Sequence, residues 1–223
     1  MRHNISSITE IRDIIIADLV LIVAFSLILG RYGIHGFLSG FIAALPISAL
    51  GVTLSFVLHE LMHKFVAQRY GAIAEFRSSR IGLLITLASG AFGFLIGIPG
   101  ATYIFSHSFT KRQNGIVSLA GPAANLAIFA LFLAAGQFFT GTYAATAIQF
   151  VIFISIWLAF FNMLPIFPFD GSKVLSWSLP VYASMMGLIL VLMLAFVPII
   201  PISYLIFVII IALAFSMFYR VLI

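Results

Sequence analysis

The sequence predicts an α-helical polytopic membrane protein, and three observations support that fold class. Of its 223 residues, 63% are hydrophobic and 8% are charged, whereas soluble domains are about half apolar and a quarter charged. The mean hydropathy is +1.24. The apolar runs have the length of membrane-spanning helices, about 20 residues, and not of barrel strands. We therefore expect about six transmembrane helices, no cleavable signal peptide, and a single membrane-embedded domain over residues 1–223.

The first two predicted spans cover residues 14–29 and 38–66. Asp18 lies one turn inside the first span, where an interfacial position is the more common explanation for a carboxylate. The second span contains Pro46, which predicts a kink. It ends in His59-Glu60-Leu61-Met62-His63, followed by Lys64.

The sequence of residues 67–114 does not predict a simple transmembrane helix. Residues 72–77 alternate between apolar and polar side chains, which predicts a strand. Residues 81–104 are apolar and long enough to cross a membrane, but they include Gly82, Gly90, Gly93, Gly97, Pro99 and Gly100. We therefore expect a β-hairpin or a re-entrant, broken helix that packs against protein, where irregular backbone is tolerated.

The remaining predicted spans cover residues 116–138, 144–164, 181–197 and 202–219, the last two joined by a tight turn at 198–201. Pro165 and Pro168 follow the fourth span and break its helix. They place Asp170 and Gly171 in a loop or at the start of a short helix.

The positions of Lys and Arg predict the topology. If residues 81–104 do not cross the membrane, ten of the 11 basic residues lie on one side and Arg31 alone lies on the other. If that segment crosses once, the split falls to six against five. The positive-inside rule favours the first arrangement, so both termini and the His59–His63 end of the second span are expected in the cytoplasm. The net charge of +5 then reflects basic loops near anionic lipid and not a nucleic-acid partner.

The His-Glu-x-x-His motif predicts a metal site. His59 and His63 are four residues apart and share one face of a helix, so both imidazoles can reach one ion. Glu60 lies beside them, where a carboxylate can hold and deprotonate a metal-bound water. The chain has no cysteine, so zinc would need histidine, carboxylate and water ligands.

A catalytic zinc usually has a third protein ligand. The candidates are His3, His35, His107, Glu10, Glu75, Asp13, Asp18 and Asp170. Asp170 is favoured, because it follows two helix-breaking prolines, precedes Gly171 and lies on the same predicted side as His63. The alternative is that Asp170 is the N-cap of a short helix through Trp177.

Three segments together resemble the site-2 protease family of intramembrane zinc metalloproteases (peptidase family M50). They are H-E-L-M-H at 59–63, G-P-A-A-N at 121–125 and N-M-L-P-I-F-P-F-D-G at 162–171. The resemblance covers residues 40–177, which would be the catalytic core. Unlike many members, this sequence has no PDZ or CBS domain, which leaves substrate selection and regulation open.

The resemblance implies a role for each matching residue. His59, His63 and Asp170 would bind one Zn²⁺, and Glu60 would be the general base. Asn162 would lie near the substrate carbonyl, and Asn125 would be structural or would contact substrate. The family's membrane-embedded β-hairpin implies that Gly100, Ala101 and Thr102 begin an edge strand, running to residue 104, that pairs with an extended substrate.

The predicted function is therefore hydrolysis of a peptide bond in or near the transmembrane segment of a membrane protein, in regulated intramembrane proteolysis. Two alternatives from other classes remain. One is a catalytically silent membrane-binding protein on the same fold, although Glu60 is intact. The other is a metal-ion transporter, although the spans offer few polar groups along a through path. The oligomeric state is not predicted.

Overall fold

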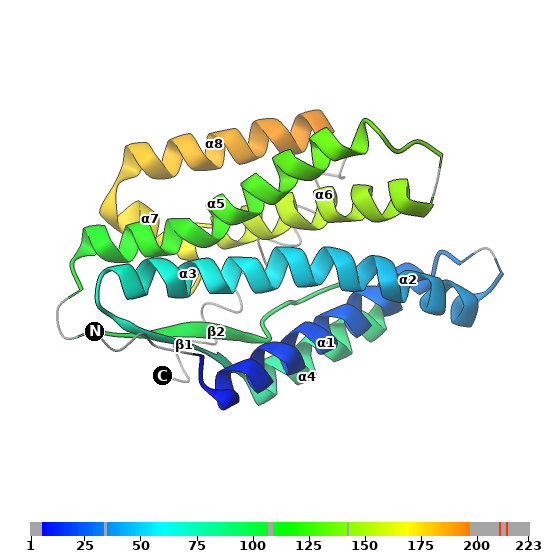
Figure 1. Ribbon diagram of the computed structural model, residues 1–223, viewed down its shortest axis with the longest axis horizontal. Coiled ribbons are helices and arrows are strands. Elements are labelled where there is room, and N and C mark those ends of the chain that lie inside the picture. The colour runs from blue at the N-terminus through cyan, green and yellow to red at the C-terminus, as the bar shows by residue number, and fades with distance from the viewer. Residues whose placement is uncertain are drawn as a thin grey trace.

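The computed structural model describes residues 6–33, 35–106, 109–141, 143–196, 210 and 213. Its elements, in chain order, are α1 (Ile8–Gly30), α2 (Phe37–Val52), the π-helical turn η1 (Thr53–Val57), α3 (Leu58–Arg69), β1 (Ile73–Ser78), α4 (Arg80–Phe92), β2 (Gly100–Phe105), α5 (Lys111–Gly136), α6 (Tyr143–Asn162), α7 (Asp170–Trp177) and α8 (Leu179–Phe196). The continuous helix formed by α2, η1 and α3 lies in the middle of the molecule, with α5 to α8 on one side and α1, α4 and the strands on the other (Figure 1).

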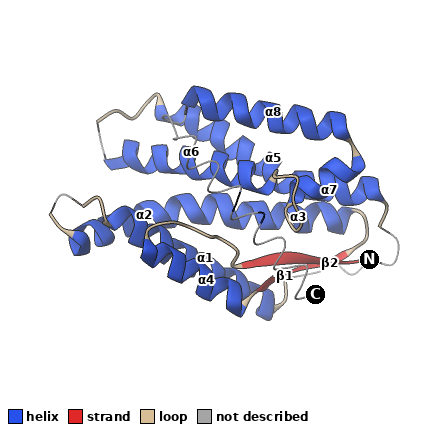
Figure 2. Ribbon diagram, turned by 180° about the vertical axis from the view of Figure 1, so that it is seen from behind, coloured by secondary structure: helices blue, strands red, loops and turns tan. Residues whose placement is uncertain are grey.

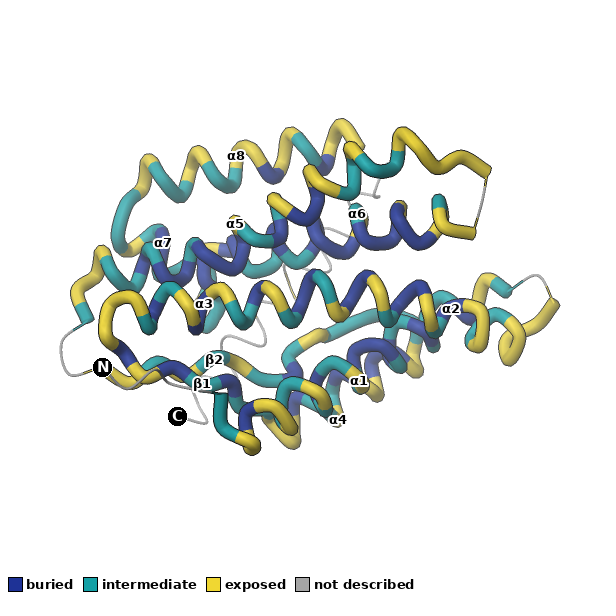
Figure 3. The backbone as a smooth tube through the Cα atoms, in the orientation of Figure 1, coloured by how far each residue is buried: buried dark blue, intermediate teal, exposed yellow. Residues whose placement is uncertain are grey.

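Five helices are long and apolar enough to cross a membrane, which confirms the predicted polytopic helical fold. They span Ile8–Gly30, Phe37–Arg69, Lys111–Gly136, Tyr143–Asn162 and Leu179–Phe196. The predicted span at 202–219 and the turn at 198–201 lie outside the described residues, apart from Ile210 and Leu213. In α8 only 11% of the apolar window is buried, so most residues of this helix are partly or fully exposed (Figure 3).

The second span is irregular at η1, which begins seven residues after its proline. Pro46 lies inside α2, whereas the chain widens into a π-helical turn only at Thr53. The hydroxyl of Ser55 in this turn bonds that of Ser155 on α6 at 2.8 Å. Asp18 of α1 accepts a hydrogen bond from the Thr53 hydroxyl at 2.7 Å. The wide turn therefore offers polar contacts to two neighbouring helices directly before the histidine motif, where π-turns often accompany functional sites.

The predicted hairpin is confirmed, with a short helix inserted between its strands. β1 and β2 pair antiparallel, from Ile73 opposite Phe105 to Ser78 opposite Gly100. Of the residues between them, Arg80–Phe92 form α4, whose 13 residues reach only about 20 Å, less than the hydrocarbon thickness of about 30 Å. Figure 2 shows both strands on the side of α3 that faces away from α5 and α8.

The N-terminal half of α1 covers the outer edge of β1. The backbone N–H of Phe76 donates to Glu10 and that of Ser78 donates to Asp13, both at 3.2 Å. Glu10 is 1% exposed and pairs with Lys64 of α3, which is 4% exposed. A buried, paired carboxylate of α1 thus ties β1 to the helix that bears the histidine motif.

Candidate metal centre

The two histidines of the motif lie on one face of α3, as their spacing predicts. His59 is 3% exposed and His63 is 7% exposed. Their Nε2 atoms are 3.0 Å apart, and the rings meet edge to face with their centroids separated by 4.7 Å. Both imidazoles therefore direct the same nitrogen to the same point.

Asp170 completes this group from a segment more than 100 residues further along the chain. Its Oδ2 atom lies 3.4 Å from His59 Nε2 and 3.0 Å from His63 Nε2. One ligand atom from each of the three residues falls within 4.8 Å of the others. Asp170 is the first residue of α7, and the N-cap is Phe169. The N-cap role considered for Asp170 is therefore wrong.

The other ring nitrogen of each histidine is directed at a partner on α5. His63 Nδ1–H donates to the backbone carbonyl of Val117 at 2.8 Å. The side-chain amide of Asn125 lies 3.1 Å from His59 Nδ1. Asn125 is fully buried, and its Oδ1 atom has no hydrogen-bond partner among the described residues. Exchanging the amide oxygen and nitrogen lets Oδ1 accept the His59 Nδ1 proton. Each Nε2 then keeps its lone pair for a metal.

The donor set suits zinc. Two neutral imidazole nitrogens and one carboxylate oxygen are a usual catalytic zinc set. Ligands about 2.0–2.1 Å from a tetrahedral zinc are roughly 3.3–3.4 Å from one another, close to the 3.0–3.4 Å separations here. Gly121 of α5 keeps the space clear, because a β-carbon at this position would lie 2.5 Å from His63 Nε2 and 2.6 Å from His59 Nε2.

Asp170 is held in its charged form. Burial raises the pKa of its carboxyl group, but the cationic form of His63, hydrogen bonds donated by His59 and His63, and Lys173 together outweigh burial, so the pKa lies well below its usual range. Lys173 Nζ is 3.7 Å from Asp170 Oδ1, the oxygen that faces away from the histidines. A divalent cation bound by the same three residues would replace the protons on the two Nε2 atoms, because imidazole binds a metal in its neutral form.

Glu60 lies in the same cavity as the three candidate ligands. The cavity has a volume of about 390 Å³, and its wall includes His59, Glu60, His63, Thr102, Asn162 and Asp170. Glu60 Oε2 accepts a hydrogen bond from the Thr102 hydroxyl at 2.7 Å. Apolar side chains of α1, α4 and α6 continue the wall, among them Phe25, Ile85 and Leu158. The site therefore combines a candidate metal group, a carboxylate and a mostly apolar space.

Asn125 and Asn162 lie at different points of the site. Asn125 contacts His59, whereas Asn162 lies in the cavity wall and its amide donates to the carbonyl of Leu158 at 2.9 Å. Gly100, Ala101 and Thr102 begin β2 and line the same cavity. Sequence reasoning missed the Val117 carbonyl, which has no sequence signature. It also missed the role of Gly121, although this glycine begins the G-P-A-A-N segment that supports the family resemblance.

A buried His-His-Asp group with an adjacent glutamate, carried by a multi-pass helical protein, has the features of a membrane-bound zinc metalloprotease. Comparison with known proteins agrees. Over 147 residues the chain is 42% identical to a protein of Methanocaldococcus jannaschii that is named a candidate zinc metalloprotease, MJ0611, a match covering 65% of this chain and 76% of the relative. It is 33% identical over 150 residues to Rip2 of Mycolicibacterium smegmatis, which bears the same description, covering 56% of this chain and 58% of the relative.

A third relative, the zinc metalloprotease MJ0392 of Methanocaldococcus jannaschii, is 28% identical over 122 residues, which are 54% of this chain and 31% of that protein. No family model matches the chain, and no solved structure matches it. The chain belongs to the site-2 protease family of zinc metalloproteases, and zinc is its cofactor.

Proposed function

We propose that the protein hydrolyses peptide bonds in or near the transmembrane segments of membrane proteins, with His59, His63 and Asp170 as zinc ligands and Glu60 as the general base. The observation that carries the proposal is the convergence of these four side chains in one cavity, from α3 and from the start of α7. Residues 40–177 contain all of them and form the catalytic core of a single membrane-embedded domain.

The residues of the chain divide the chemistry between them. Bound zinc supplies a water of lowered pKa and polarises the scissile carbonyl. Glu60 accepts the proton of the attacking water and then delivers it to the leaving amine. Asn125 and the Val117 carbonyl keep both histidines in the tautomer with a free Nε2. Asn162, in the cavity wall, offers an amide near the substrate carbonyl.

β2 provides the place where an unwound substrate docks. A helical substrate has its carbonyls bonded within the helix, so the segment to be cleaved must become extended before attack. The outer edge of β1 is occupied by Glu10 and Asp13, so among the described residues β2 is the strand that can accept another. An extended substrate on β2, beginning at Gly100, Ala101 and Thr102, forms main-chain hydrogen bonds in the manner of strand addition.

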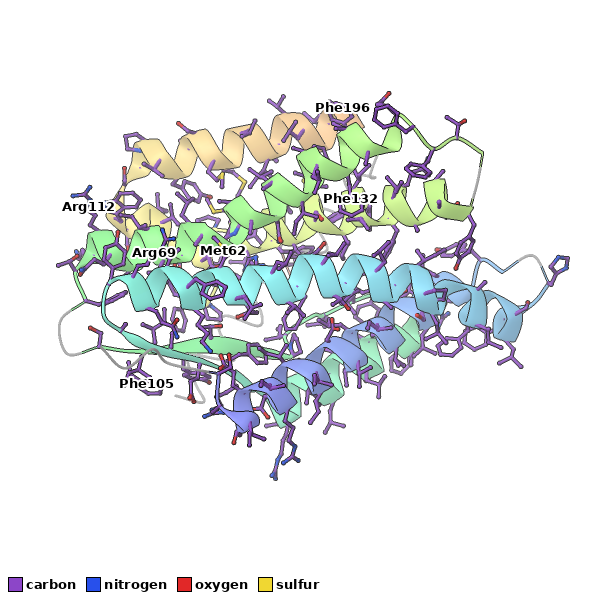
Figure 4. All side chains as sticks on the ribbon, viewed as in Figure 1. Met62, Arg69, Phe105, Arg112, Phe132 and Phe196 are labelled. Atoms are coloured by element: carbon purple, nitrogen blue, oxygen red, sulfur yellow. The ribbon has the colours of Figure 1, made fainter. Side chains whose placement is uncertain are left out.

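The end of the molecule that bears α7 faces the cytoplasm. Arg69 and Arg112 lie toward one end of the molecule, whereas Phe196 lies toward the other (Figure 4). The site, at the start of α7, lies toward the end with Arg69. Arg31 follows α1 at the opposite end and donates to the carbonyl of Ala91. This distribution follows the positive-inside rule and brings cytoplasmic water close to the zinc site.

The test uses the full chain, purified in detergent, with fluorescein-labelled β-casein as an unstructured protein substrate. The wild-type protein is expected to cleave the casein, and a zinc chelator is expected to stop cleavage. Glu60→Gln should be inactive while elemental analysis still finds about one zinc per chain, because the base is removed and the ligands remain. Equal cleavage by the wild type and Glu60→Gln would exclude Glu60 as the base.

Asp170→Ala tests the ligand set separately. Removal of one of three protein ligands should lower the zinc content far below that of Glu60→Gln. An unchanged zinc stoichiometry in Asp170→Ala would exclude Asp170 as a ligand, whatever the outcome for Glu60.

A further inference from the structure

The strand that lines the cavity also holds the proposed base. Thr102 of β2 donates its hydroxyl proton to Glu60 Oε2 at 2.7 Å. Both residues are half-buried, and β2 is anchored to β1 by pairing along its whole length. The hydrogen bond therefore joins the catalytic helix α3 to a strand that is also held in place by its pairing with β1. Because a carboxylate accepts it, this bond is among the stronger kinds of hydrogen bond.

The backbone N–H and C=O groups of Thr102 point away from β1. The N–H groups of Phe76 and Ser78 point away from β2, since they donate to Glu10 and Asp13 of α1. Opposed residues of an antiparallel pair share the same hydrogen-bonding direction. Thr102 lies opposite Phe76, and Gly100 lies opposite Ser78. The backbone N–H and C=O of Thr102 and Gly100 are thus directed away from β1, toward the outer edge of β2.

We propose that Thr102 is a positioning residue, whose hydroxyl orients the Glu60 carboxylate and whose backbone receives the substrate strand. The inference rests on the proposed function and adds to it a link between substrate docking and the base. A substrate that pairs with β2 contacts the same residue that holds Glu60. Threonine suits the task, because its β-branched side chain has restricted χ1 freedom on a strand. The hydroxyl is thereby kept in one direction.

The first test compares Thr102→Val with Thr102→Ser in cleavage of fluorescein-labelled β-casein. Valine keeps the shape of threonine but removes the donor, whereas serine keeps the donor. Loss of a hydrogen bond to a charged group corresponds to roughly a 10- to 100-fold loss of rate. Thr102→Val should lose this in kcat with KM and zinc content little changed, and Thr102→Ser should stay close to the wild type. A higher KM with unchanged kcat in Thr102→Val would reduce Thr102 to a substrate contact and overturn the proposal.

The second test does not depend on turnover. Cobalt(II)-substituted protein is titrated with acetohydroxamate, a metal chelator whose hydroxyl group can bond the base, and binding is followed by visible absorption. Thr102→Val should weaken binding by about tenfold in the Glu60 background and leave it unchanged in the Glu60→Gln background. If Thr102→Val weakens acetohydroxamate binding by the same factor in both backgrounds, Thr102 does not act through Glu60. Failure of the wild type to bind cobalt would instead reject the metal site and with it the proposed function.

Discussion

Gly121 of α5 packs directly against His63 of α3, so closely that a β-carbon at residue 121 would lie 2.5 Å from His63 Nε2. The same β-carbon would lie 2.6 Å from Nε2 and Cε1 of His59. A side chain at residue 121 would thus occupy the point toward which both imidazoles are directed. Glycine is needed here for the space beside the ligands, because the residue lies inside a regular helix and not in a turn.

Gly121→Ala is therefore expected to lose zinc although every ligand is retained. The added methyl group must displace the imidazoles, since contacts below 3.0 Å are not tolerated in packed interiors. Elemental analysis of the purified variant should find well under one zinc per chain. Gly187→Ala is the matched control, because nothing lies within 4 Å of a β-carbon at residue 187 in α8. If Gly121→Ala and Gly187→Ala bind zinc equally, the metal does not lie between the two histidines.

Asn125 should set zinc affinity through His59. Asn125→Ala removes the acceptor of the His59 Nδ1 proton, and loss of such a partner weakens metal binding about 10- to 100-fold. Asn125→Asp keeps an acceptor oxygen at the same place and should bind zinc more tightly than Asn125→Ala. Competition with a chromophoric chelator measures both affinities. Identical affinities for Asn125→Ala and the wild type would mean that Asn125 has only a packing role.

The buried Glu10–Lys64 pair should matter for stability. Glu10→Gln leaves the Lys64 ammonium buried without its counter-charge, and breaking a buried ion pair in this way costs about 3–5 kcal/mol. Thermal or denaturant unfolding in detergent should show a large loss. Glu75→Gln is the comparison, since the side chains of Glu75 and Arg77 are 27% and 37% exposed and such a pair contributes about 0–1 kcal/mol. Equal losses in the two variants would contradict a structural role for the buried pair.

The orientation in the membrane can be read from single cysteines, because the chain contains none of its own. Ser39 and Ser176 are both exposed, and they lie near opposite ends, at the start of α2 and on α7 (Figure 1). A membrane-impermeant maleimide should label Ser39→Cys in intact cells, and Ser176→Cys only after permeabilisation. The reverse pattern would place the basic end of the molecule, and the site with it, outside the cytoplasm.

The helices and the hairpin could be predicted because each rests on a local signal. Hydropathy over about 20 residues identifies a span, and the glycines and proline within 81–104 argued against a plain helix there. The charge count then placed the histidine motif and Asp170 at one side, and the structure brings their side chains within ligand distance. The wide turn at Thr53–Val57 was not predicted, because it has no signature comparable to a proline and is accompanied by contacts with other helices.

Contacts between distant segments could not be predicted from the sequence. The pairing of Glu10 with Lys64 joins residues 54 positions apart, and no sequence pattern around either residue indicates the other as its partner. The same is true of Thr102 and Glu60, which are 42 positions apart. The first contact requires α1 to lie beside α3, and the second requires β2 to lie beside α3. Such contacts depend on tertiary packing, which the spacing of residues along the chain does not reveal.

Glu60, beside a zinc bound by His59, His63 and Asp170, is proposed to act as the base in cleavage within or next to membrane segments. The most direct measurement compares the N-terminal peptides of membrane proteins from cells that express the wild-type chain with those from cells that express Glu60→Gln at the same level. The account predicts new N-termini inside or next to transmembrane segments with the wild type and their absence with Glu60→Gln. The same set of fragments in both strains would contradict it.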